Sequence, residues 1–338
     1  MSVSLYYDDV FLDHYTRGHP ESPERLVAIV ERLRTLDQAG LTWRPAAEPV
    51  TDEILELVHP KAFWQGLRQL SANGGGWIDA DTYCTPASYG VARRAVGTSV
   101  ECSVRVCEDR MPGFALVRPP GHHASANRAM GFCLMNNVAV AARGAQQLAG
   151  IDRVAIIDID VHHGNGTQDI FLEDPTVLYC SLHQAPFYPQ TGMADLTGRG
   201  AGSGTTVNVP LPAGTGGLAW LEAFDRSVAP AVGRFQPDLI LVSAGFDGHV
   251  LEPFADFALS TAVYGEVATR IAGLAHETPV GASAWFLEGG YALGATAGSC
   301  AVVVEALCDR ANAAQPERGP LEREHDDHVD WTASGVDR

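Results

Sequence analysis

Residues 158–167 read DIDVHHGNGT and place four ionisable side chains beside an apolar run. Burying carboxylates and imidazoles is costly unless they are paired or bind a metal. If the run folds as a strand, Asp158, Asp160 and His162 point to one face, because side chains alternate along a strand. Their place at the carboxyl end of a strand predicts half of a metal site, whereas His163 faces the other way and receives no role. Taken singly, each residue would also fit a helix-capping aspartate or a hydrogen-bonded core histidine.

A second segment offers a matching ligand. Asp247 follows the apolar run Leu239–Gly245, at the carboxyl end of another expected strand. His249 is a rival, but it lies further into the loop, where its side chain is held less firmly. Two carboxylates and one histidine leave a divalent metal open to water and substrate, which is typical of catalytic sites.

Two further motifs carry groups that can donate or accept protons. His122 and His123 lie in RPPGHH, and Tyr291 ends FLEGGY. Adjacent histidines can act as acid and base when their partners give them different pKa values, and Asp158 and Asn165 are candidates for those partners. A tyrosine hydroxyl at this place could donate a hydrogen bond to a polarised carbonyl. Alone, a surface histidine pair and a structural turn would also explain these motifs.

The elements that must position these residues are apolar, β-branched runs that alternate with helical patterns. Nearly continuous apolar runs are typical of strands buried on both faces of a parallel sheet. Their alternation with helices predicts a three-layer α/β architecture with right-handed crossovers. The expected strands are Val154–Ile159, Thr176–Ser181, Leu239–Ser243 and Ala284–Leu287. The expected helices are Asn137–Leu148, Leu218–Phe235 and Phe257–Leu274.

The domain organisation is simple. No internal repeat is present, and we expect one catalytic domain over residues 1–310. The glycine-rich segment Gln184–Gly217 is expected to be a long loop, and such loops are usually functional or disordered. Beyond about Asp309 the sequence becomes polar and charged, which predicts a flexible tail over residues 311–338.

Composition restricts the class of function. Of the 338 residues, 46% are hydrophobic and 19% are charged, which suits a globular protein, and the net charge of −18 argues against nucleic-acid binding through a basic surface. That charge would favour basic partners, although solubility alone also explains it. The seven cysteines are scattered without a CxxC pair, as expected in a reducing, cytoplasmic compartment. We expect neither a secretion signal nor a membrane-spanning segment.

Together and in this order, the motifs resemble the histone deacetylase superfamily, which includes acetylpolyamine amidohydrolases and bacterial deacetylase-like amidohydrolases. The resemblance runs from Leu5 to Leu307, and HHGNG and EGGY are closest to the class II and bacterial branch. The matching segments are HPESPERL (19–26), RPPGHH (118–123), GFCLMNNVAVAA (131–142), DIDVHHGNGT (158–167), CSLH (180–183), AGFD (244–247) and EGGY (288–291).

The resemblance implies the arginase/deacetylase fold, an α/β sandwich around an eight-stranded, mainly parallel sheet. It also implies a zinc ion, with iron as the alternative, held by Asp160, His162 and Asp247. The implied catalytic residues are His122 with its partner Asp158, His123 with its partner Asn165, and Tyr291. A structural potassium ion is implied on Asp158, Ser181 and the backbone carbonyls of Asp160, His162 and Leu182.

The same resemblance implies a substrate channel. Its residues are Gly131, Phe132, Tyr188, Phe254 and the rim carboxylate Asp81. Relatives more often have phenylalanine where this chain has Tyr188. Polyamine-selective relatives have glutamate where it has Phe254, which argues against that selectivity, although Glu252 lies near enough to leave the question open. Arg25 stands where relatives have an arginine beneath the metal, near a proposed acetate exit.

The predicted function is a zinc-dependent amidohydrolase that removes acetyl or other short acyl groups from acyl-lysine or related N-acyl amines. Acetylpolyamines and small amides are alternative substrates. A binuclear ureohydrolase related to arginase would need further bridging carboxylates, and a non-catalytic acyl-lysine reader would have lost a ligand or Tyr291. The predicted partner is an acylated substrate, with no nucleic acid and no membrane, and self-association is left open.

Overall fold

Eight parallel strands form the centre of the molecule, and the computed structural model describes residues 2–15, 17–36 and 40–313. The strand order is β2-β1-β5-β10-β9-β6-β7-β8, and every pairing in this sheet is parallel. The strands are β1 (Val3–Tyr6), β2 (Leu41–Arg44), β5 (Gly113–Ala115), β6 (Val154–Asp158), β7 (Val177–Gln184), β8 (Thr206–Leu211), β9 (Leu239–Ala244) and β10 (Ser283–Leu287). A separate antiparallel pair joins β3 (Gly76–Trp77) to β4 (Tyr83–Cys84).

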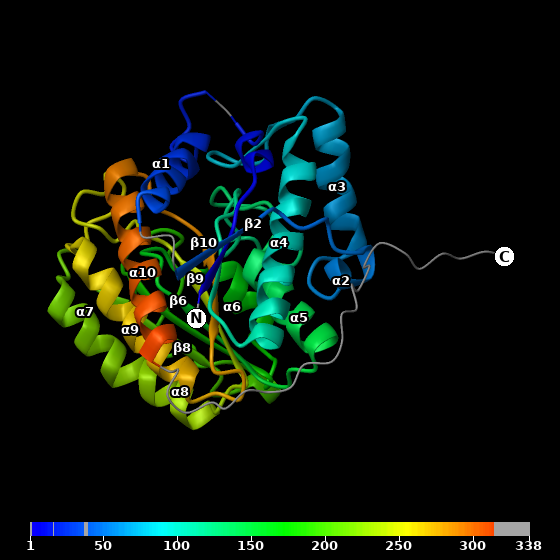
Figure 1. Ribbon diagram of the computed structural model, residues 1–338. Helices are drawn as coiled ribbons and strands as arrows, with labels where there is room; N and C mark the ends of the chain where they lie inside the picture. The colour runs from blue at the N-terminus through cyan, green and yellow to red at the C-terminus, as the bar shows by residue number, and fades with distance from the viewer. Residues whose placement is uncertain (1, 16, 37–39, 314–338) are drawn as a thin grey trace, which may run out of the picture.

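Helices cover both faces of the sheet, which confirms the predicted three-layer α/β fold (Figure 1). One layer contains α2 (Asp52–Glu56), α3 (Lys61–Ala72), α4 (Ser88–Asp109) and α5 (Asn137–Ala149). The other contains α1 (Pro23–Arg34), α7 (Gly217–Ala223), α8 (Ala229–Phe235), α9 (Thr261–His276) and α10 (Leu293–Ala313). The short α6 (Asn165–Phe171) contacts α5 and β7. No helix in the described ranges is long and apolar enough to cross a bilayer.

Local signals explain where α5 begins and ends. The side chain of Asn136 accepts a hydrogen bond from the backbone N–H of Ala139 at 3.0 Å and so caps the first turn. The helix stops at Gly150, which has a left-handed φ of +66°, a conformation that glycine adopts without strain. Because α5 packs along α4, these signals fix one helix of the layer that covers the sheet.

The central strands are buried along their whole length, as their continuous apolar runs predicted. Each fully buried valine, leucine or isoleucine contributes roughly 1.5–3 kcal/mol relative to exposure. The register aligns Asp158 of β6 with Ser243 of β9, and Leu287 of β10 with Ala244 of β9. The loops that follow these three strands therefore begin at the same edge of the sheet.

Several sequence boundaries were wrong. The segment expected to be one loop from Gln184 to Gly217 contains β8, because its Thr-Val-Asn-Val run pairs with β7. The expected helix Phe257–Leu274 begins only at Thr261, since Leu259 forms a bridge with His249. The expected helix Leu218–Phe235, in contrast, is confirmed: α7, a π-helical segment (Phe224–Val228) and α8 follow one another without a break.

Two further boundaries concern the site and the tail. Strand β6 ends at Asp158, one residue before the expected end, so Asp160 and His162 lie in a turn rather than on a strand face. Helix α10 continues to Ala313, through the expected start of the tail at residue 311. The remainder of the proposed tail, residues 314–338, lies outside the described residues.

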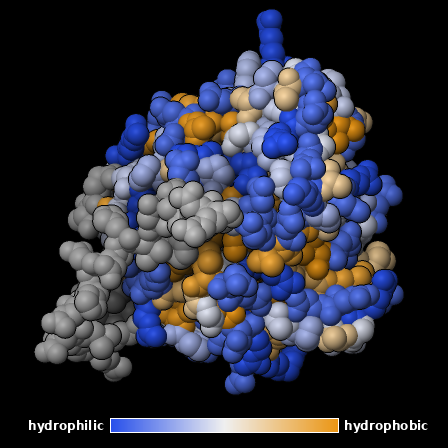
Figure 2. Space-filling view, turned by 90° about the vertical axis from the view of Figure 1, so that its right-hand side faces the viewer, coloured by the Kyte–Doolittle hydropathy of each residue, from blue (hydrophilic) through white to orange (hydrophobic). Residues whose placement is uncertain are grey.

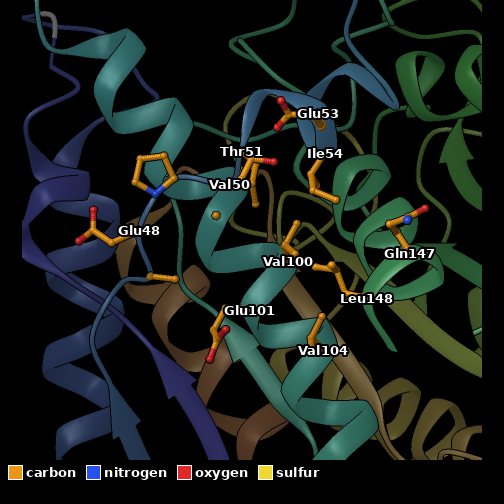
Figure 3. A pocket seen from close by; sticks show the side chains of 13 residues that line it. Glu48, Val50, Thr51, Glu53, Ile54, Val100, Glu101, Val104, Gln147 and Leu148 are labelled. Atoms are coloured by element: carbon orange, nitrogen blue, oxygen red, sulfur yellow. The ribbon is translucent and has the colours of Figure 1, made fainter. Parts of the chain in front are cut away.

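A large apolar hollow lies between α2, α4 and α5. Figure 2 views the side of the molecule on which α2, α3 and α5 lie, where apolar residues form separate patches within a mostly hydrophilic surface. The hollow has a volume of about 450 Å³, and Ile54, Val100, Val104 and Leu148 are among its lining residues. In Figure 3 these four side chains gather on one side of the space.

Candidate active site

The loops that follow β6, β9 and β10 meet the loop that follows β5 at one edge of the sheet. They bring together Asp160 and His162, Asp247, Tyr291, and the pair His122 and His123. These residues are separated by up to 169 positions in the sequence but line or underlie one cavity. Parallel α/β sheets place their sites at this edge, because several strands deliver loop residues to it.

Asp160, His162 and Asp247 form the first cluster. The Nδ1 atom of His162 lies 3.1 Å from Asp160 Oδ1 and 3.1 Å from Asp247 Oδ2. One ligand atom from each residue lies within 4.8 Å of the other two. Both carboxylates are fully buried, so a positive charge between them is needed to offset their repulsion. This nitrogen and oxygen donor set fits a divalent metal ion.

Backbone donors orient the two carboxylates of this cluster. Asp160 Oδ2 accepts a hydrogen bond from the N–H of Gly289 at 2.9 Å, and Asp247 Oδ1 accepts one from Val161 at 2.9 Å. A Cβ atom on Gly289 would lie 2.2 Å from Asp247 Oδ2, and one on Gly245 would lie 2.0 Å from Asp160 Oδ2. The glycines in AGFD and EGGY are therefore required for the carboxylates to fit.

The charges in this cluster shift its pKa values. Burial alone lowers the pKa of His162, but the carboxylates of Asp247 and Asp160 raise it to about 10. Burial and the neighbouring charge of Asp160 raise the pKa of Asp247. The two carboxylates thus favour a cation at the position of the imidazole proton, and a metal ion that replaces this proton satisfies the same demand.

His122 and His123 lie beside this cluster with their ring centroids 4.0 Å apart. The Nδ1 atom of His122 lies 3.0 Å from Asp158 Oδ2, and the Nδ1 atom of His123 lies 2.9 Å from Asn165 Oδ1. Asp158 Oδ2 also accepts a hydrogen bond from the hydroxyl of Tyr179 at 3.0 Å. One imidazole therefore contacts a carboxylate and the other a neutral amide.

The different partners separate the pKa values of the two histidines. Burial alone lowers the pKa of His122, but the carboxylates of Asp160 and Asp158 raise it well above the usual range. Burial and the neighbouring His122 and His162 lower the pKa of His123 well below that range. A charged and a neutral imidazole thus lie side by side, an arrangement suited to acid–base chemistry.

A cavity of about 250 Å³ opens above these groups. Its lining residues are Asp81, Pro120, His122, His123, Gly131, Phe132, His162, Phe187, Tyr188, Phe254, Gly289 and Tyr291. The Phe132 ring and the Phe254 ring both meet the Tyr291 ring nearly edge-on, at 5.7 Å and 5.5 Å. The walls are therefore aromatic and the floor is polar, as suits an extended apolar group with one polar end.

Tyr291 projects into this cavity from the loop after β10. Burial raises the pKa of its phenol well above the usual range, so the hydroxyl stays protonated and can donate a hydrogen bond. The guanidinium of Arg25 lies over the ring of Tyr291, 4.9 Å from its centroid.

Comparisons with known proteins agree with this geometry. The Histone deacetylase domain model matches residues 19–307. The chain belongs to the histone deacetylase family. Histone deacetylase 14, chloroplastic, of Arabidopsis thaliana is 41% identical over 322 aligned residues, which cover 90% of this chain and 76% of that protein.

Two further relatives extend the comparison. The Histone deacetylase-like amidohydrolase of Pseudomonas aeruginosa is 39% identical, and the match covers 81% of this chain and 73% of that protein. The crystal structure of the HDA15 HD domain superposes with a TM-score of 0.84 at 37% identity, covering 91% of this chain and 90% of that one. The family and the names of these relatives support deacetylase activity, the hydrolysis of an amide.

Arg25 is fixed by a buried charge network. Its Nε atom donates to the carbonyl of Gly290 at 2.6 Å, and its NH1 atom lies 3.1 Å from Glu21 Oε1. Glu21 also pairs with Arg118, and all three side chains are fully buried. The network holds the loop that carries Tyr291. Sequence reasoning missed Glu21 and Arg118, although HPESPERL places Glu21 four residues before Arg25, just ahead of Ser22, the N-cap of α1.

Glu288 was also missed, because EGGY had been interpreted through its glycines and its tyrosine. Its Oε2 atom accepts hydrogen bonds from the backbone N–H groups of Gly121 and His122, at 2.6 Å and 3.1 Å. Burial raises the pKa of this carboxyl group to about 7. Glu288 therefore ties the loop after β10 to the tandem histidines.

The five expected channel residues all line this cavity, and Phe187 joins them. Gly131 has a φ of +56°, and a Cβ atom there would lie 2.5 Å from His123, so only glycine fits beside the ring. Phe187 was missed: its ring stacks on His162 at 5.2 Å with an interplanar angle of 21°. Tyr188 lies beside it and meets His123 edge-on at 5.2 Å.

Asp81 lies at the cavity lining beside a second carboxylate. Burial and hydrogen bonding with Asp79 raise the pKa of Asp81. Asp79 Oδ1 accepts the backbone N–H of Thr82 at 2.8 Å, and the Thr82 hydroxyl accepts the N–H of Phe132 at 3.1 Å. The segment that carries Asp81 is thereby linked to the channel wall.

Three of the proposed potassium ligands, Asp158, Ser181 and Leu182, lie on neighbouring strands. Asp158 of β6 stands opposite Ser181 of β7 in the parallel register, and Leu182 follows on the same strand. The Ser181 hydroxyl lies 2.9 Å from Nδ1 of His183. The structure therefore brings Asp158 and Ser181 side by side.

Two histidines lie outside the metal cluster. His163 is buried, with Nδ1 2.7 Å from the Thr191 hydroxyl and Nε2 3.1 Å from Gln168 Oε1. His249, the rival ligand, has Nε2 3.1 Å from the Thr261 hydroxyl. Both rings have structural hydrogen bonds.

Proposed function

We propose that this chain is a zinc-dependent hydrolase that removes acetyl or other short acyl groups from acyl-lysine or related N-acyl amines. The observation that carries this proposal is the convergence of a buried two-carboxylate, one-histidine cluster, a neutral histidine and a protonated tyrosine around one aromatic cavity. This set matches the needs of amide hydrolysis: a polarised carbonyl, an activated water and a stabilised oxyanion.

Asp160, His162 and Asp247 would hold the metal ion. Bound there, a divalent ion would supply Lewis acidity toward the amide carbonyl and the attacking water. Zinc accepts nitrogen and oxygen ligands of this kind, and ferrous iron is the alternative ion. The hydrogen bonds from Gly289 and Val161 fix the carboxylates, so the chain positions its ligands before the ion binds.

His123 is the proposed general base. Its lowered pKa keeps the ring neutral near pH 7, and the hydrogen bond to Asn165 orients it without adding charge. It accepts the proton of the attacking water and returns it to the departing nitrogen. His122 remains protonated beside Asp158 and places a positive charge near the developing oxyanion. An ion bound to Asp160 would weaken one of the two attractions that raise the pKa of His122, which leaves Asp158 as its main support.

Tyr291 is the proposed oxyanion donor. Burial raises the pKa of its phenol well above the usual range, so the hydroxyl is protonated near pH 7 and can donate a hydrogen bond. The network of Arg25 and Glu21 holds the carbonyl side of the tyrosine loop and leaves the hydroxyl facing the cavity. The oxyanion therefore meets a donor that is already in place.

The aromatic walls favour an unbranched aliphatic arm that carries the acyl group. The net charge of −18 favours basic peptides or amines outside the channel. Phe254 lines the cavity and Glu252 does not, so we propose acyl-lysine ahead of acetylpolyamines or small amides. A steady-state comparison of acetyl-lysine peptides, acetylpolyamines and longer acyl groups tests this order.

The deciding experiment is turnover of a fluorogenic acetyl-lysine amide. We expect activity that a chelator abolishes and that one zinc ion per chain restores, with iron tested in parallel under anaerobic conditions. Two divalent ions per chain and release of urea from arginine would favour a ureohydrolase instead. Binding of acetyl-lysine without turnover in the metal-loaded protein would favour a reader.

Further parts of the prediction remain proposals. We propose a structural potassium ion on Asp158 and Ser181 with the carbonyls of Asp160, His162 and Leu182, which potassium-dependent thermal stability would test. We also propose one catalytic domain over residues 1–310, a cytoplasmic location consistent with seven free cysteines, and no nucleic-acid partner. Self-association is open to measurement by light scattering.

A further inference from the structure

We propose that Glu252 is a positioning residue that holds Tyr291 in place through the tyrosine's own backbone. This inference rests on the proposed function and extends it to a residue that does not touch the substrate. Glu252 lies five positions after Asp247, in the loop that also carries Phe254.

The contact is a carboxylate clamp on two successive peptide groups. The Oε2 atom of Glu252 accepts hydrogen bonds from the backbone N–H of Tyr291 at 3.0 Å and from that of Ala292 at 3.1 Å. The side chain is 7% exposed, so water competes little for these bonds. Burial and the neighbouring charge of Asp247 raise the pKa of this carboxyl group to about 7, and Oε2 can accept both bonds in either protonation state.

The loop that carries Tyr291 is held on both sides of the tyrosine. Gly290 has a φ of +116°, and Arg25 holds the carbonyl on the preceding side of the tyrosine. Glu252 accepts hydrogen bonds from the N–H groups of Tyr291 and Ala292, so the peptide groups on both sides of Tyr291 have a buried side-chain partner. A shift of about 1 Å in the hydroxyl would lower the rate substantially, because oxyanion stabilisation depends on donor geometry.

Its surroundings show that Glu252 does not serve as a cation receptor in the channel. Phe254 lines the cavity and its ring packs against Tyr291, whereas Glu252 is absent from that lining. The other oxygen, Oε1, is buried and has no hydrogen-bond partner among the described residues. The Oε2 atom is therefore committed to the tyrosine loop, which supports a positioning role.

The first test is a double-mutant cycle on the zinc-loaded full chain with an acetyl-lysine amide. We expect Glu252→Ala to lower kcat roughly 10- to 100-fold with little change in KM or metal content, because the tyrosine hydroxyl loses its fixed place. In a Tyr291→Phe background the same change should lower kcat less than about twofold, since the group it positions is gone. Glu252→Gln keeps an acceptor oxygen and should stay within about threefold of the wild type.

Asp256→Ala is the matched control. Asp256 lies in the same loop and is exposed, and its side chain accepts a hydrogen bond from Gln184 rather than from the tyrosine loop. We expect it to leave kcat unchanged in both backgrounds. Equal losses from Glu252→Ala with and without the Tyr291 hydroxyl would overturn the inference, because that pattern describes a general structural role.

The second test does not depend on activity. Hydrogen–deuterium exchange should show the amides of Tyr291 and Ala292 exchanging at least about tenfold faster in Glu252→Ala and unchanged in Asp256→Ala. Unchanged protection at both amides would also overturn the inference. If the wild type hydrolyses no acyl amide, the proposed function fails, and the exchange result still decides the role of Glu252.

Discussion

Two cavities of this molecule have opposite characters. The hollow between α2, α4 and α5 is the larger, about 450 Å³ against 250 Å³, and its lining is mostly apolar. Its acids, Glu48, Glu53 and Glu101, lie apart around the space in Figure 3. The channel above Asp160 is smaller, but buried carboxylates, imidazoles and a phenol converge on it.

The difference teaches that converging buried charge, rather than volume, distinguishes the candidate active site. In the hollow, Glu48 pairs with Arg94 and Glu101 with Arg105, and the Glu48 side chain is 68% exposed. Such surface pairs contribute little energy. In the channel, burial and close charges move the pKa values of His122 and His123 in opposite directions. Changes at the two places should therefore have opposite effects on activity and stability.

The largest expected effect is at a proposed metal ligand. Asp160→Asn should reduce turnover to near the detection limit, at least about a thousandfold, because the neutral amide is a much weaker ligand and the positive charge nearby loses its partner. Metal content measured on the purified protein should fall in parallel. Glu48→Gln in the hollow is the control and should retain metal and activity. A metal-free Asp160→Asn variant with normal turnover would contradict the assignment.

Tyr291→Phe should have the next largest effect. Loss of one oxyanion donor lowers kcat by about 10²- to 10³-fold. KM and metal content should change little, since the phenyl ring still packs against Phe132 and Phe254. Steady-state kinetics with metal analysis on the same preparation provides the measurement. Full activity would remove the role of the hydroxyl, and metal loss would show that the substitution acts on the ligands instead.

The buried strands and the motifs of the candidate site could be predicted from the sequence, because both depend on local patterns of residues. Continuous apolar runs predict the buried strands. The order and residue types of the motifs are specific enough to indicate the family. The roles of the buried carboxyl groups of Glu288 and Glu252 could not be predicted in this way. Glu288 and Glu252 act on backbone N–H groups 167 and 39 residues away, so no local pattern records their contacts. The apolar hollow left no signal either, because its walls come from three helices whose packing is a tertiary property.

The turn at Asp160 shows the same limit in detail. Strand alternation placed Asp158, Asp160 and His162 on one face, yet β6 ends at Asp158. The two metal-site residues converge because the turn after the strand is held by the hydrogen bond from the N–H of Asp160 to Asp158 Oδ1, at 3.2 Å. Strand alternation therefore grouped Asp158, Asp160 and His162 together, but in the structure a turn, not a strand face, brings Asp160 and His162 to the cluster.

The effect of pH on thermal stability should differ between a variant at Glu288, beside the tandem histidines, and a variant at Glu101, in the hollow. The folded-state pKa of Glu288 is raised to about 7, so the folded protein binds its proton more tightly than the unfolded chain does. The stability that this proton provides is fully present below the unfolded pKa of about 4.3 and is lost as pH rises through 7. Glu288→Gln resembles the protonated form, so its Tm relative to the wild type should rise between pH 5 and pH 8.

Glu101→Gln is the control for that comparison, because its side chain lies at the partly exposed rim of the hollow and pairs with Arg105. Thermal unfolding at both pH values should show a constant difference from the wild type for this variant. A constant difference for Glu288→Gln as well would mean that the Glu288 carboxyl titrates alike in the folded and unfolded states.

The smallest expected effect on activity is in the hollow itself. Val104 is 4% exposed and lies on its wall, so Val104→Ala removes buried methyl groups and should lower the free energy of unfolding by about 1–2 kcal/mol. Because the site depends on the loops after β5, β6, β9 and β10 rather than on this wall, kcat and KM should stay within about twofold of the wild type. Denaturant unfolding gives the first quantity and steady-state kinetics the second. A loss of turnover larger than the loss of stability explains would show that the two cavities are energetically coupled through α4, and that the hollow belongs to the catalytic machinery after all.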